Sequence, residues 1–394
     1  MEYEISRKMQ NVKASAIREI FKALVDPTII SFAGGNPASD AFPVDAIKKA
    51  SADLLEEDPI GMLQYGLTEG DPEFLQEAGK FFNRNEQVTK DNDQMITCTG
   101  SQQVMDLASK VLCNEGDVVL VEEPSFLGSL NSFKENGCIL RGVPFKDGQM
   151  DLEKLEIALQ TAPKPKFMYL IPNFQNPMGT TMSLETRKAI LSLAKKYQVL
   201  ILEDDPYGAL RFEGEDVPSL KALDQDGLVI YAVSMSKIMA PGMRVACAIG
   251  PKPVIGKMVV AKQGADVHTC LWPQKVIARL LKTFDMDAHL TRIKGIYKEK
   301  CELMLSEMDR EFSPKVTYTR PHGGMFIWVT MPDDADMNAF VQAALEQKVA
   351  VVPGNAFLTD DTKECHCFRM NFSTPSNENI VKGVKILGEL TKKL

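Results

Sequence analysis

The sequence predicts an α/β protein with a largely parallel β-sheet, followed by a smaller α+β part toward the C-terminus. Continuous apolar runs of strand length recur through the middle of the chain, and segments with helical spacing separate them. Strands that are apolar throughout are covered on both faces, which is typical of parallel sheets flanked by helices. After about residue 283 the pattern changes to one long helix followed by short strands and helices.

The expected strands of the large sheet each end in polar residues. The first spans residues 95–100 (MITCTG), and the helical pattern of residues 101–113 follows it directly. A further helix is expected at 183–197, with Ser183 as its N-cap. The other expected strands lie at 117–124, 166–173, 199–206 and 228–236.

Three parts are expected along the chain: an N-terminal arm at 1–45, a large domain at 46–283 and a small domain at 284–394. The arm should hold a short helix at 14–25 and then ISFAGGNPASDAFP, which is too rich in Gly and Pro for regular structure. The expected elements of the small domain are a long helix through 290–308, the strands VTYTR and GGMFIWVTM, a helix at 337–347, the strand FRMNFS and a closing helix.

Composition excludes several classes of protein. The 394 residues suggest two or three domains of about 100–200 residues each. A net charge of −8 argues against a nucleic-acid-binding surface. No apolar run approaches the roughly 20 residues that span a bilayer, and the N-terminal MEYEISRKMQ lacks the apolar region of a signal peptide. We therefore expect a cytoplasmic protein that acts on small molecules, without nucleic-acid or membrane partners.

The eight cysteines predict neither a disulfide framework nor a metal site. They are scattered, and Cys98 and Cys247 lie inside strand-like runs, so free thiols in a reducing compartment are expected. Cys365-His366-Cys367 lacks a second ligand pair at the spacing of a zinc finger, so no metal is expected there.

The segment VSMSKIMAPGMRVACAIG (233–250) places two cations in a run that otherwise looks buried. Burial lowers the pKa of a lysine, and a neutral Lys237 would be a nucleophile able to form a Schiff base. Arg244 cannot lose its charge and suits a phosphate. The alternative is an amphipathic surface segment whose lysine extends to water.

The strand ends together supply what a phosphorylated pyridine cofactor requires, because ligands of parallel sheets bind at the carboxyl ends of the strands. The cofactor needs an amine, a phosphate cup, an acid for its ring nitrogen, donors to its ring oxygen and a flat side chain over the ring; the substrate needs an arginine for its carboxylate. The candidate amine is Lys237, and the candidate phosphate ligands are Arg244, Ser234, Ser236, Ser101 and Gln102. Asp204 or Asp205 is the candidate acid for the ring nitrogen, and Asn176 and Tyr207 are the candidate donors to the ring oxygen. Phe126 is the candidate for the side chain over the ring, and Arg369 for the arginine that binds the substrate carboxylate.

Each candidate also has an ordinary structural explanation when it is taken alone. Asp204 and Asp205 could cap a turn before Pro206, and Asn176-Pro177 is a common turn dipeptide. Their order at consecutive strand ends is what favours a cofactor site.

In that order, PNFQNPMG, EDDPY, VSMSKIMAPGMRVA and FRMNFS resemble the motifs of the fold-type-I, pyridoxal-phosphate-dependent aminotransferases of classes I and II. Further segments, among them LQYGLTEGDPEF, TGSQQVMDLASKV, EEPSFLGSL and YTRPHGGMF, are similar to the 2-aminoadipate/kynurenine aminotransferase group. The resemblance covers nearly the whole chain. It implies a large domain whose mostly parallel sheet has seven strands.

The resemblance also implies a role for each matching residue. Lys237 would hold pyridoxal 5′-phosphate covalently, and Asp204 would face its ring nitrogen, which leaves Asp205 a structural role. Tyr65 would reach the cofactor phosphate of the neighbouring subunit, so the active unit would be a homodimer. The other implied cofactor contacts are Asn176 and Tyr207 with the ring oxygen, Phe126 with the ring face, and Ser101, Gln102, Ser234 and Arg244 with the phosphate. The implied substrate contacts are Arg369 and Asn176 with the α-carboxylate, Gly35 through its backbone, and Ser15 and Arg18 with the distal end of a dicarboxylic substrate.

Three residues depart from the pattern of the group that the chain resembles. Phe126 stands where many relatives have tyrosine, Asn36 replaces a residue that is more often apolar, and Trp272 adds bulk after ADVHTC. These differences affect the expected substrate preference and leave the expected reaction type unchanged.

We therefore predict a ping-pong aminotransferase that moves the amino group of an L-amino acid to a 2-oxo acid such as 2-oxoglutarate. Arg18 favours 2-aminoadipate or glutamate as donor, whereas a moving arm would admit aromatic or branched donors. A β-lyase or another enzyme with the same cofactor is the alternative, and an effector-binding regulator is a more distant one. A nucleotide-binding module ranks last because no glycine-rich phosphate motif follows a strand.

Overall fold

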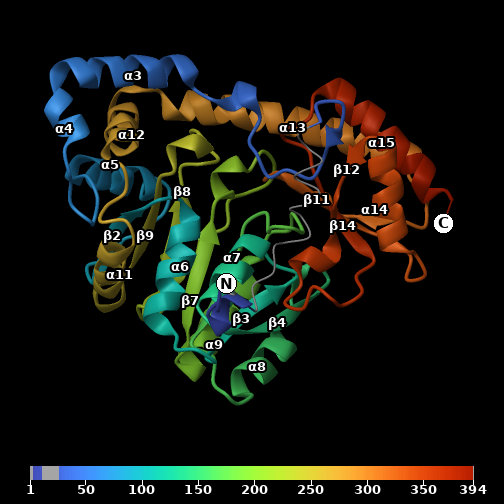
Figure 1. Cartoon of the computed structure of the whole chain (residues 1–394), viewed down its shortest axis with the longest axis horizontal. Helices are drawn as coiled ribbons and strands as arrows, with labels where there is room; N and C mark the ends of the chain where they lie inside the picture. Colours follow the sequence, from blue (N-terminus) through green and yellow to red (C-terminus); the bar gives the residue numbers. More distant parts are fainter. Residues whose placement is uncertain (1–2, 11–25, 394) are drawn as a thin grey trace.

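A twisted eight-stranded sheet forms the centre of the larger part of the molecule (Figure 1). The computed structural model describes residues 3–10 and 26–393. In the sheet order β2-β9-β8-β7-β6-β3-β4-β5, neighbours from β8 to β4 run parallel, and β9 is antiparallel to both β2 and β8. The prediction of an α/β fold with a mostly parallel sheet is therefore confirmed. The strands are β2 (Asp93–Cys98), β3 (Val118–Glu123), β4 (Ile139–Lys146), β5 (Gln149–Met150), β6 (Phe167–Leu170), β7 (Leu200–Asp205), β8 (Val229–Ser234) and β9 (Ala246–Pro251).

Helices cover both faces of this sheet, which explains the continuous apolar runs in the sequence. Side chains alternate between the two faces along a strand: Val119 and Val121 of β3 join one core cluster, while Val118 and Leu120 join another. The first cluster includes residues of α6 (Ser101–Leu112) and α7 (Leu127–Glu135). The second includes residues of α8 (Leu152–Gln160), α9 (Leu184–Tyr197) and α10 (Leu220–Leu223).

The sequence predicted the start of α9 correctly but did not reveal the short strand β5. Ser183 caps α9 as expected, because its Oγ accepts a hydrogen bond of 3.1 Å from the N–H of Thr186. The expected count of seven strands missed β5. This two-residue strand pairs with the end of β4 across a turn in which Asp147 and Gly148 have φ of 51° and 73°, and so short a strand leaves no alternating pattern.

A second sheet lies beside the first, at the right of Figure 1, and is antiparallel in the order β10-β11-β14-β13. Its formation matches the α+β pattern expected after residue 283. The elements here are α13 (Met286–Glu311), β10 (Thr317–Tyr318), β11 (Phe326–Thr330), α14 (Met337–Glu346), β13 (Val352–Pro353), β14 (Cys367–Asn371) and α15 (Asn377–Thr391).

The N-terminal segment is tied to this second part by a short parallel pair. β1 (Ile30–Ser31) pairs with β12 (Val349–Ala350), so the expectation that ISFAGGNPASDAFP lacks regular structure is wrong at this point. The strand exists because the backbone of Ile30 and Phe32 bonds to Lys348 and Ala350, a tertiary contact that local composition does not reveal. The expected helix at 14–25 lies outside the described residues, and the domain boundaries at 45 and 283 stay predictions.

A further group of helices lies at the left of Figure 1. No helix in the described part of the chain is both long and apolar enough to cross a membrane. These helices are α3 (Val44–Glu57), α4 (Pro59–Leu63), α5 (Pro72–Phe82), α11 (Lys252–Ala265) and α12 (Leu271–Thr283).

Candidate active site

A cavity of about 360 Å³ lies at the carboxyl ends of the parallel strands. It is the place where ligands bind in open α/β sheets. Side chains reach it from the segments after β6, β7 and β8, from the start of α6, from the N-terminal segment and from β14. The lining residues that the sequence predicted are Gly35, Ser101, Gln102, Phe126, Asn176, Asp204, Tyr207, Ser234, Ser236, Lys237, Arg244 and Arg369.

Lys237 is the one amine among these lining residues. It follows β8 in a turn, and its Nζ donates a hydrogen bond of 2.7 Å to the carbonyl oxygen of Gly35. Burial lowers the pKa of Lys237 to about 8, and the nearby cations of Arg369 and Arg244 act in the same direction. Since a lysine is nucleophilic only when neutral, this environment makes the amine reactive near neutral pH.

Asp204, the residue before the last one of β7, is buried, and one of its carboxylate oxygens has a hydrogen-bond partner while the other has none in the described part of the chain. Its Oδ2 accepts a hydrogen bond of 2.8 Å from the hydroxyl of Tyr169, which in turn accepts one of 2.9 Å from Ser129. Its Oδ1 has no partner in the described residues. Burial raises the pKa of Asp204 to about 7. A buried acceptor without a donor is destabilising, so Oδ1 is suited to a ligand that brings an N–H.

The opposite end of the cavity is suited to a phosphate. α6 begins at Ser101, so its first backbone N–H groups have no helical partner and face an anion favourably. Arg244 lies beside them and donates to the carbonyl oxygen of Thr99 at 3.3 Å. Gly100 has a φ of 77°, and a Cβ at this position would overlap the Arg244 guanidinium. Only glycine therefore leaves room for this arginine next to the helix start.

Arg369 forms a third binding element in the cavity. Its Nη1 donates to Asn176 Oδ1 at 2.8 Å and its Nη2 to the carbonyl oxygen of Ala33 at 2.7 Å, while its buried Nε has no partner in the described residues. The guanidinium lies 4.2 Å from the ring centre of Phe326 and 5.0 Å from that of Phe357. Burial lowers the pKa of Arg369 to about 10. It remains a cation at neutral pH and is suited to a carboxylate.

The buried Lys237 shares one cavity with Arg244 near the start of α6 and with Arg369, and these are the residues that the motifs predicted to lie together. Residues 27–387 match the family described as aminotransferase class I and II. The chain belongs to this family. It is a pyridoxal-phosphate-dependent aminotransferase of fold type I, as the resemblance of its motifs implied.

Several named enzymes are similar to this chain over nearly its whole length. Aromatic-amino-acid aminotransferase 1 of Thermococcus litoralis is 36% identical over 399 residues, covering 100% of this chain and 95% of the relative. The 2-aminoadipate transaminase of Thermus thermophilus is 39% identical over 387 residues, covering 97% and 95%. The crystal structure of Pyrococcus horikoshii kynurenine aminotransferase in complex with PMP, with KYN as substrate and KYA as product, has a TM-score of 0.95 at 35% identity, covering 99% of this chain and 97% of that one.

The cavity of this aminotransferase fits pyridoxal 5′-phosphate. The unpartnered Oδ1 of Asp204 matches a protonated ring nitrogen, and the free N–H groups of α6 with Arg244 match a phosphate. Lys237 lies in the same cavity as both. When bound, this cofactor supplies an electron sink for the bonds of the substrate α-carbon.

Some predicted residues of the aminotransferase lie elsewhere. Tyr65 does not line the cavity; its side chain is 80% exposed, and its ring meets that of His268 edge-on at 5.7 Å between centres. Ser15 and Arg18 lie outside the described residues. Asp205 points away from the cavity, as expected for a neighbour of Asp204 on a strand.

Sequence reasoning missed three residues that shape the site. Tyr169 and Ser129 support Asp204, and Phe326 packs under Arg369. Tyr169 lies inside the apolar run of β6, where a tyrosine is a normal core residue, so its hydroxyl partner could not be predicted. Ser129 lies within α7 and Phe326 within β11, and nothing in their local patterns indicates a site.

In the described part of the chain, no group of three or more His, Cys, Asp or Glu side chains is placed to hold a metal ion. All eight cysteines are free, and Cys98, Cys138, Cys247 and Cys301 are buried.

Proposed function

We propose that this aminotransferase moves the amino group of an L-amino acid with an acidic or a large apolar side chain to a 2-oxo acid such as 2-oxoglutarate. The observation that carries the proposal is the position of Lys237, whose amine shares one cavity with two guanidinium groups. Arg244 is suited to the cofactor phosphate and Arg369 to the substrate carboxylate. A substrate held by Arg369 is thereby oriented with its α-carbon toward the reactive amine.

Lys237 would act both as the attachment point of the cofactor and as the base. Its lowered pKa, about 8, allows Nζ to accept the α-proton and to return it later at neutral pH. Asp204 would accept a hydrogen bond from the ring nitrogen, and Asn176 with Tyr207 would hold the ring oxygen. Phe126 would cover the ring, and Ser101, Gln102, Ser234, Ser236 and Arg244 would bind the phosphate.

Arg369 would bind the α-carboxylate through the edge of its guanidinium that the protein leaves free. Asn176 and Ala33 occupy Nη1 and Nη2, whereas Nε has no partner among the described residues. The rings of Phe326 and Phe357 hold the guanidinium plane in place. A guanidinium group that is already fixed in this way binds a carboxylate with little loss of conformational entropy.

The range of donor side chains follows from the activities of similar proteins. The named activities of similar proteins include aromatic amino acids, 2-aminoadipate and kynurenine, and we extend this range to the present chain. Ser15 and Arg18 would meet the far end of a dicarboxylic donor, and Gly35 would line the same space.

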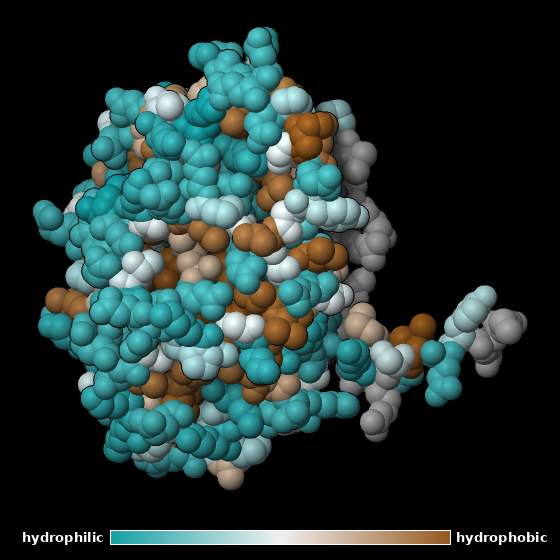
Figure 2. Space-filling view, turned by 90° about the vertical axis from the view of Figure 1, so that its left-hand side faces the viewer, coloured by the Kyte–Doolittle hydropathy of each residue, from teal (hydrophilic) through white to brown (hydrophobic). Residues whose placement is uncertain are grey.

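We also propose a homodimer in which Tyr65 completes the partner's phosphate site. The face seen in Figure 2, at the left of Figure 1, carries apolar side chains among hydrophilic ones. On α4 and the segment after it, Ile60, Leu63, Tyr65 and Leu67 are 71%, 69%, 80% and 58% exposed. Neighbouring exposed apolar residues of this kind are typical of an interface.

The eight free cysteines further support a reducing compartment such as the cytoplasm.

A donor panel tests the proposed function. The purified enzyme, loaded with pyridoxal phosphate, is mixed with single amino acids and 2-oxoglutarate, and glutamate formation is measured for each. We expect 2-aminoadipate and aromatic donors to be active and Lys237→Ala to be inactive with all of them. Pyruvate and ammonia from a cysteine conjugate, without glutamate formation from any donor, would instead favour a β-lyase. If Arg18→Ala leaves the ratio of dicarboxylic to aromatic activity unchanged, Arg18 does not bind the distal carboxylate.

A further inference from the structure

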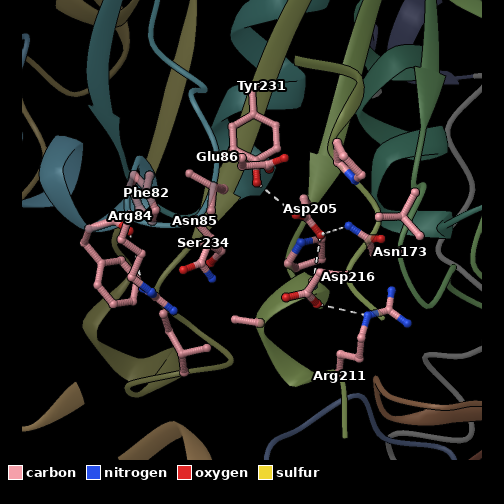
Figure 3. A pocket seen from close by; sticks show the side chains of 18 of the residues that line it. Phe82, Arg84, Asn85, Glu86, Asn173, Asp205, Arg211, Asp216, Tyr231 and Ser234 are labelled. Atoms are coloured by element: carbon pink, nitrogen blue, oxygen red, sulfur yellow. Dashed lines mark hydrogen bonds and ion pairs between the residues drawn. The ribbon is translucent and has the colours of Figure 1, made fainter. Parts of the chain in front are cut away.

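A second cavity, of about 330 Å³, opens on the other side of the strand ends that carry the cofactor site (Figure 3). Successive side chains of a strand point to opposite faces, so Asp204 lines the cofactor cavity and Asp205 lines this one. Pro206 and Ser234 contribute to both cavities. One wall of backbone and side chains therefore separates a ligand in the second cavity from the cofactor site.

Asp205 is a rigid, satisfied part of the wall of the second cavity. Its Oδ2 accepts a hydrogen bond of 2.8 Å from the hydroxyl of Tyr231. Its Oδ1 accepts from Asn173 Nδ2 at 3.1 Å and from the N–H of Gly208 at 2.9 Å. Because its lone pairs are largely engaged, Asp205 contributes negative potential rather than a direct ligand contact.

Glu86 is the carboxyl group of this cavity that has capacity for a ligand. Its Oε2 accepts a hydrogen bond of 2.8 Å from the N–H of Ser219, and burial raises the pKa of Glu86. Figure 3 shows Glu86 between Tyr231 and Asn85 at the cavity wall. A cation brought next to this carboxyl would relieve the unfavourable burial of its charge.

Two cations on the wall have no acidic partner. Neither Arg84 nor Lys294 has a carboxylate oxygen within 4.0 Å in the residues that the structure describes, although Arg84 stacks 3.8 Å from the ring centre of Phe81. Arg211 differs from both, because its Nε pairs with Asp216 at 3.2 Å. Figure 3 shows Arg84 on the opposite side of the cavity from Asp205 and Asp216. Within the described residues, the wall thus presents two cations that form no close ion pair, although Asp216 and Asp287 act on Arg84 from a greater distance.

We propose that this cavity binds a free amino acid, with its carboxylate toward Arg84 and Lys294 and its ammonium group toward Glu86. Apolar lining from Phe82, Val217 and Ile238 would contact the amino-acid side chain. The volume lies within the range of small-molecule sites. A zwitterion matches the separated charges, whereas a phosphate or a dicarboxylate would meet the carboxylates of Glu86, Asp205 and Asp216 without an ammonium group to balance them. The site would let the enzyme sense its own class of substrate through the shared wall.

Binding is measured on the full-length enzyme after borohydride has reduced the bond between Lys237 and the cofactor, which prevents reaction at the catalytic cavity. Isothermal titration calorimetry with L-leucine should show saturable binding of one molecule per chain. N-acetyl-L-leucine, which lacks the ammonium group, and 4-methyl-2-oxopentanoate should bind about 10-fold more weakly or worse, the effect of losing one charged hydrogen bond. Equal binding of all three would overturn the proposal of a zwitterion site.

Variants assign the binding to this cavity. Lys294→Ala and Arg84→Ala should each weaken L-leucine binding by about 10-fold or more. Lys298→Ala is the matched control, because Lys298 lies one turn further along α13 and pairs with Glu302 at 3.7 Å. Absence of saturable binding, or binding that Lys294→Ala and Arg84→Ala leave unchanged, would place the ligand elsewhere and contradict the proposal.

Discussion

The hydroxyl of Tyr169 donates a hydrogen bond of 2.8 Å to Oδ2 of Asp204, and this contact leaves Oδ1 of the same carboxylate as a buried acceptor without a partner in the described residues. Ser129 holds the tyrosine hydroxyl from the other side at 2.9 Å. The three residues come from β6, β7 and α7, so the carboxylate is oriented by tertiary packing. Hydrogen bonds to the charged form of an acid lower its pKa, and here they oppose the strong effect of burial.

Replacing Tyr169 by phenylalanine should weaken the contact between Asp204 and the cofactor. The loss of one hydrogen bond to a charged group is worth about 1.5–3 kcal/mol, so kcat should fall by about 10-fold or more, with KM less affected. The pH midpoint of a titration that follows the absorbance of the bound cofactor should also shift, because Asp204 becomes more basic. Ser129→Ala should shift the midpoint less, since Ser129 touches only Tyr169 of this pair. An unchanged midpoint and kcat in Tyr169→Phe would mean that Asp204 is oriented without it.

The stability of the apoprotein should fall as pH rises from about 4 to about 7. Burial raises the pKa of Asp204 from its ordinary value of 3.8 to about 7, so in this range the folded state binds a proton that the unfolded state has lost. The stabilisation is complete below the lower value and is lost as pH passes the upper one. Chemical denaturation at several pH values should show a steeper decline for the natural protein than for Asp204→Asn.

Glu122 and Glu203 make this comparison necessary. Burial raises the pKa of each to about 8, so both contribute to the decline in the same direction. The contribution of Asp204 is therefore the difference between the natural protein and Asp204→Asn in the slope of the unfolding free energy against pH. This difference should approach about 1.4 kcal/mol per pH unit, which corresponds to one bound proton. Identical slopes would show that Asp204 is not protonated in the folded apoprotein.

Gly100→Ala should weaken cofactor binding by about 10-fold or more, because its Cβ would push the Arg244 guanidinium away from the start of α6. Gly116→Ala is the matched control. Gly116 also has a positive φ, 89°, but has open space around it, so it tests backbone strain alone. Both variants should lose about 1 kcal/mol of stability, and only Gly100→Ala should lose cofactor affinity in equilibrium dialysis. Similar affinities in the two variants would argue against Arg244 as a phosphate ligand.

Subunit mixing tests the proposed role of Tyr65. Lys237→Ala and Tyr65→Ala homodimers should each have low activity, because every site lacks either its amine or its phosphate contact. After unfolding and refolding together, half of the dimers should be hybrids, each with one intact site, which restores about a quarter of the natural activity. Activity that stays at the level of the separate variants would mean that Tyr65 does not act across an interface.

Much of this protein can be predicted from its sequence, because the relevant signals are local. The apolar runs before Thr99, Pro124, Asn173 and Pro206 predicted the strands, since a strand buried on both faces must be apolar at successive positions. The polar residues that follow β6, β7 and β8 predicted the site, because the ends of parallel strands share one edge of the sheet. Lys237, Asn176 and Arg244 lie together for this reason.

The paired strands β1 and β12, the strand β5 and the residues that support the site could not be predicted in this way. β1 exists only because β12 lies beside it, and the two are more than 300 residues apart along the chain. Tyr169, Ser129 and Phe326 act through partners on other elements, and each is an ordinary residue in its own segment.

The sequence by itself determined which chemistry this protein carries, because the types and order of the residues at its strand ends suit one cofactor. Only the tertiary structure decided how that chemistry is tuned: burial lowers the pKa of Lys237, Tyr169 leaves one oxygen of Asp204 free, and aromatic rings hold Arg369. The physical reason is that desolvation and hydrogen-bond geometry depend on neighbours that come from distant parts of the chain.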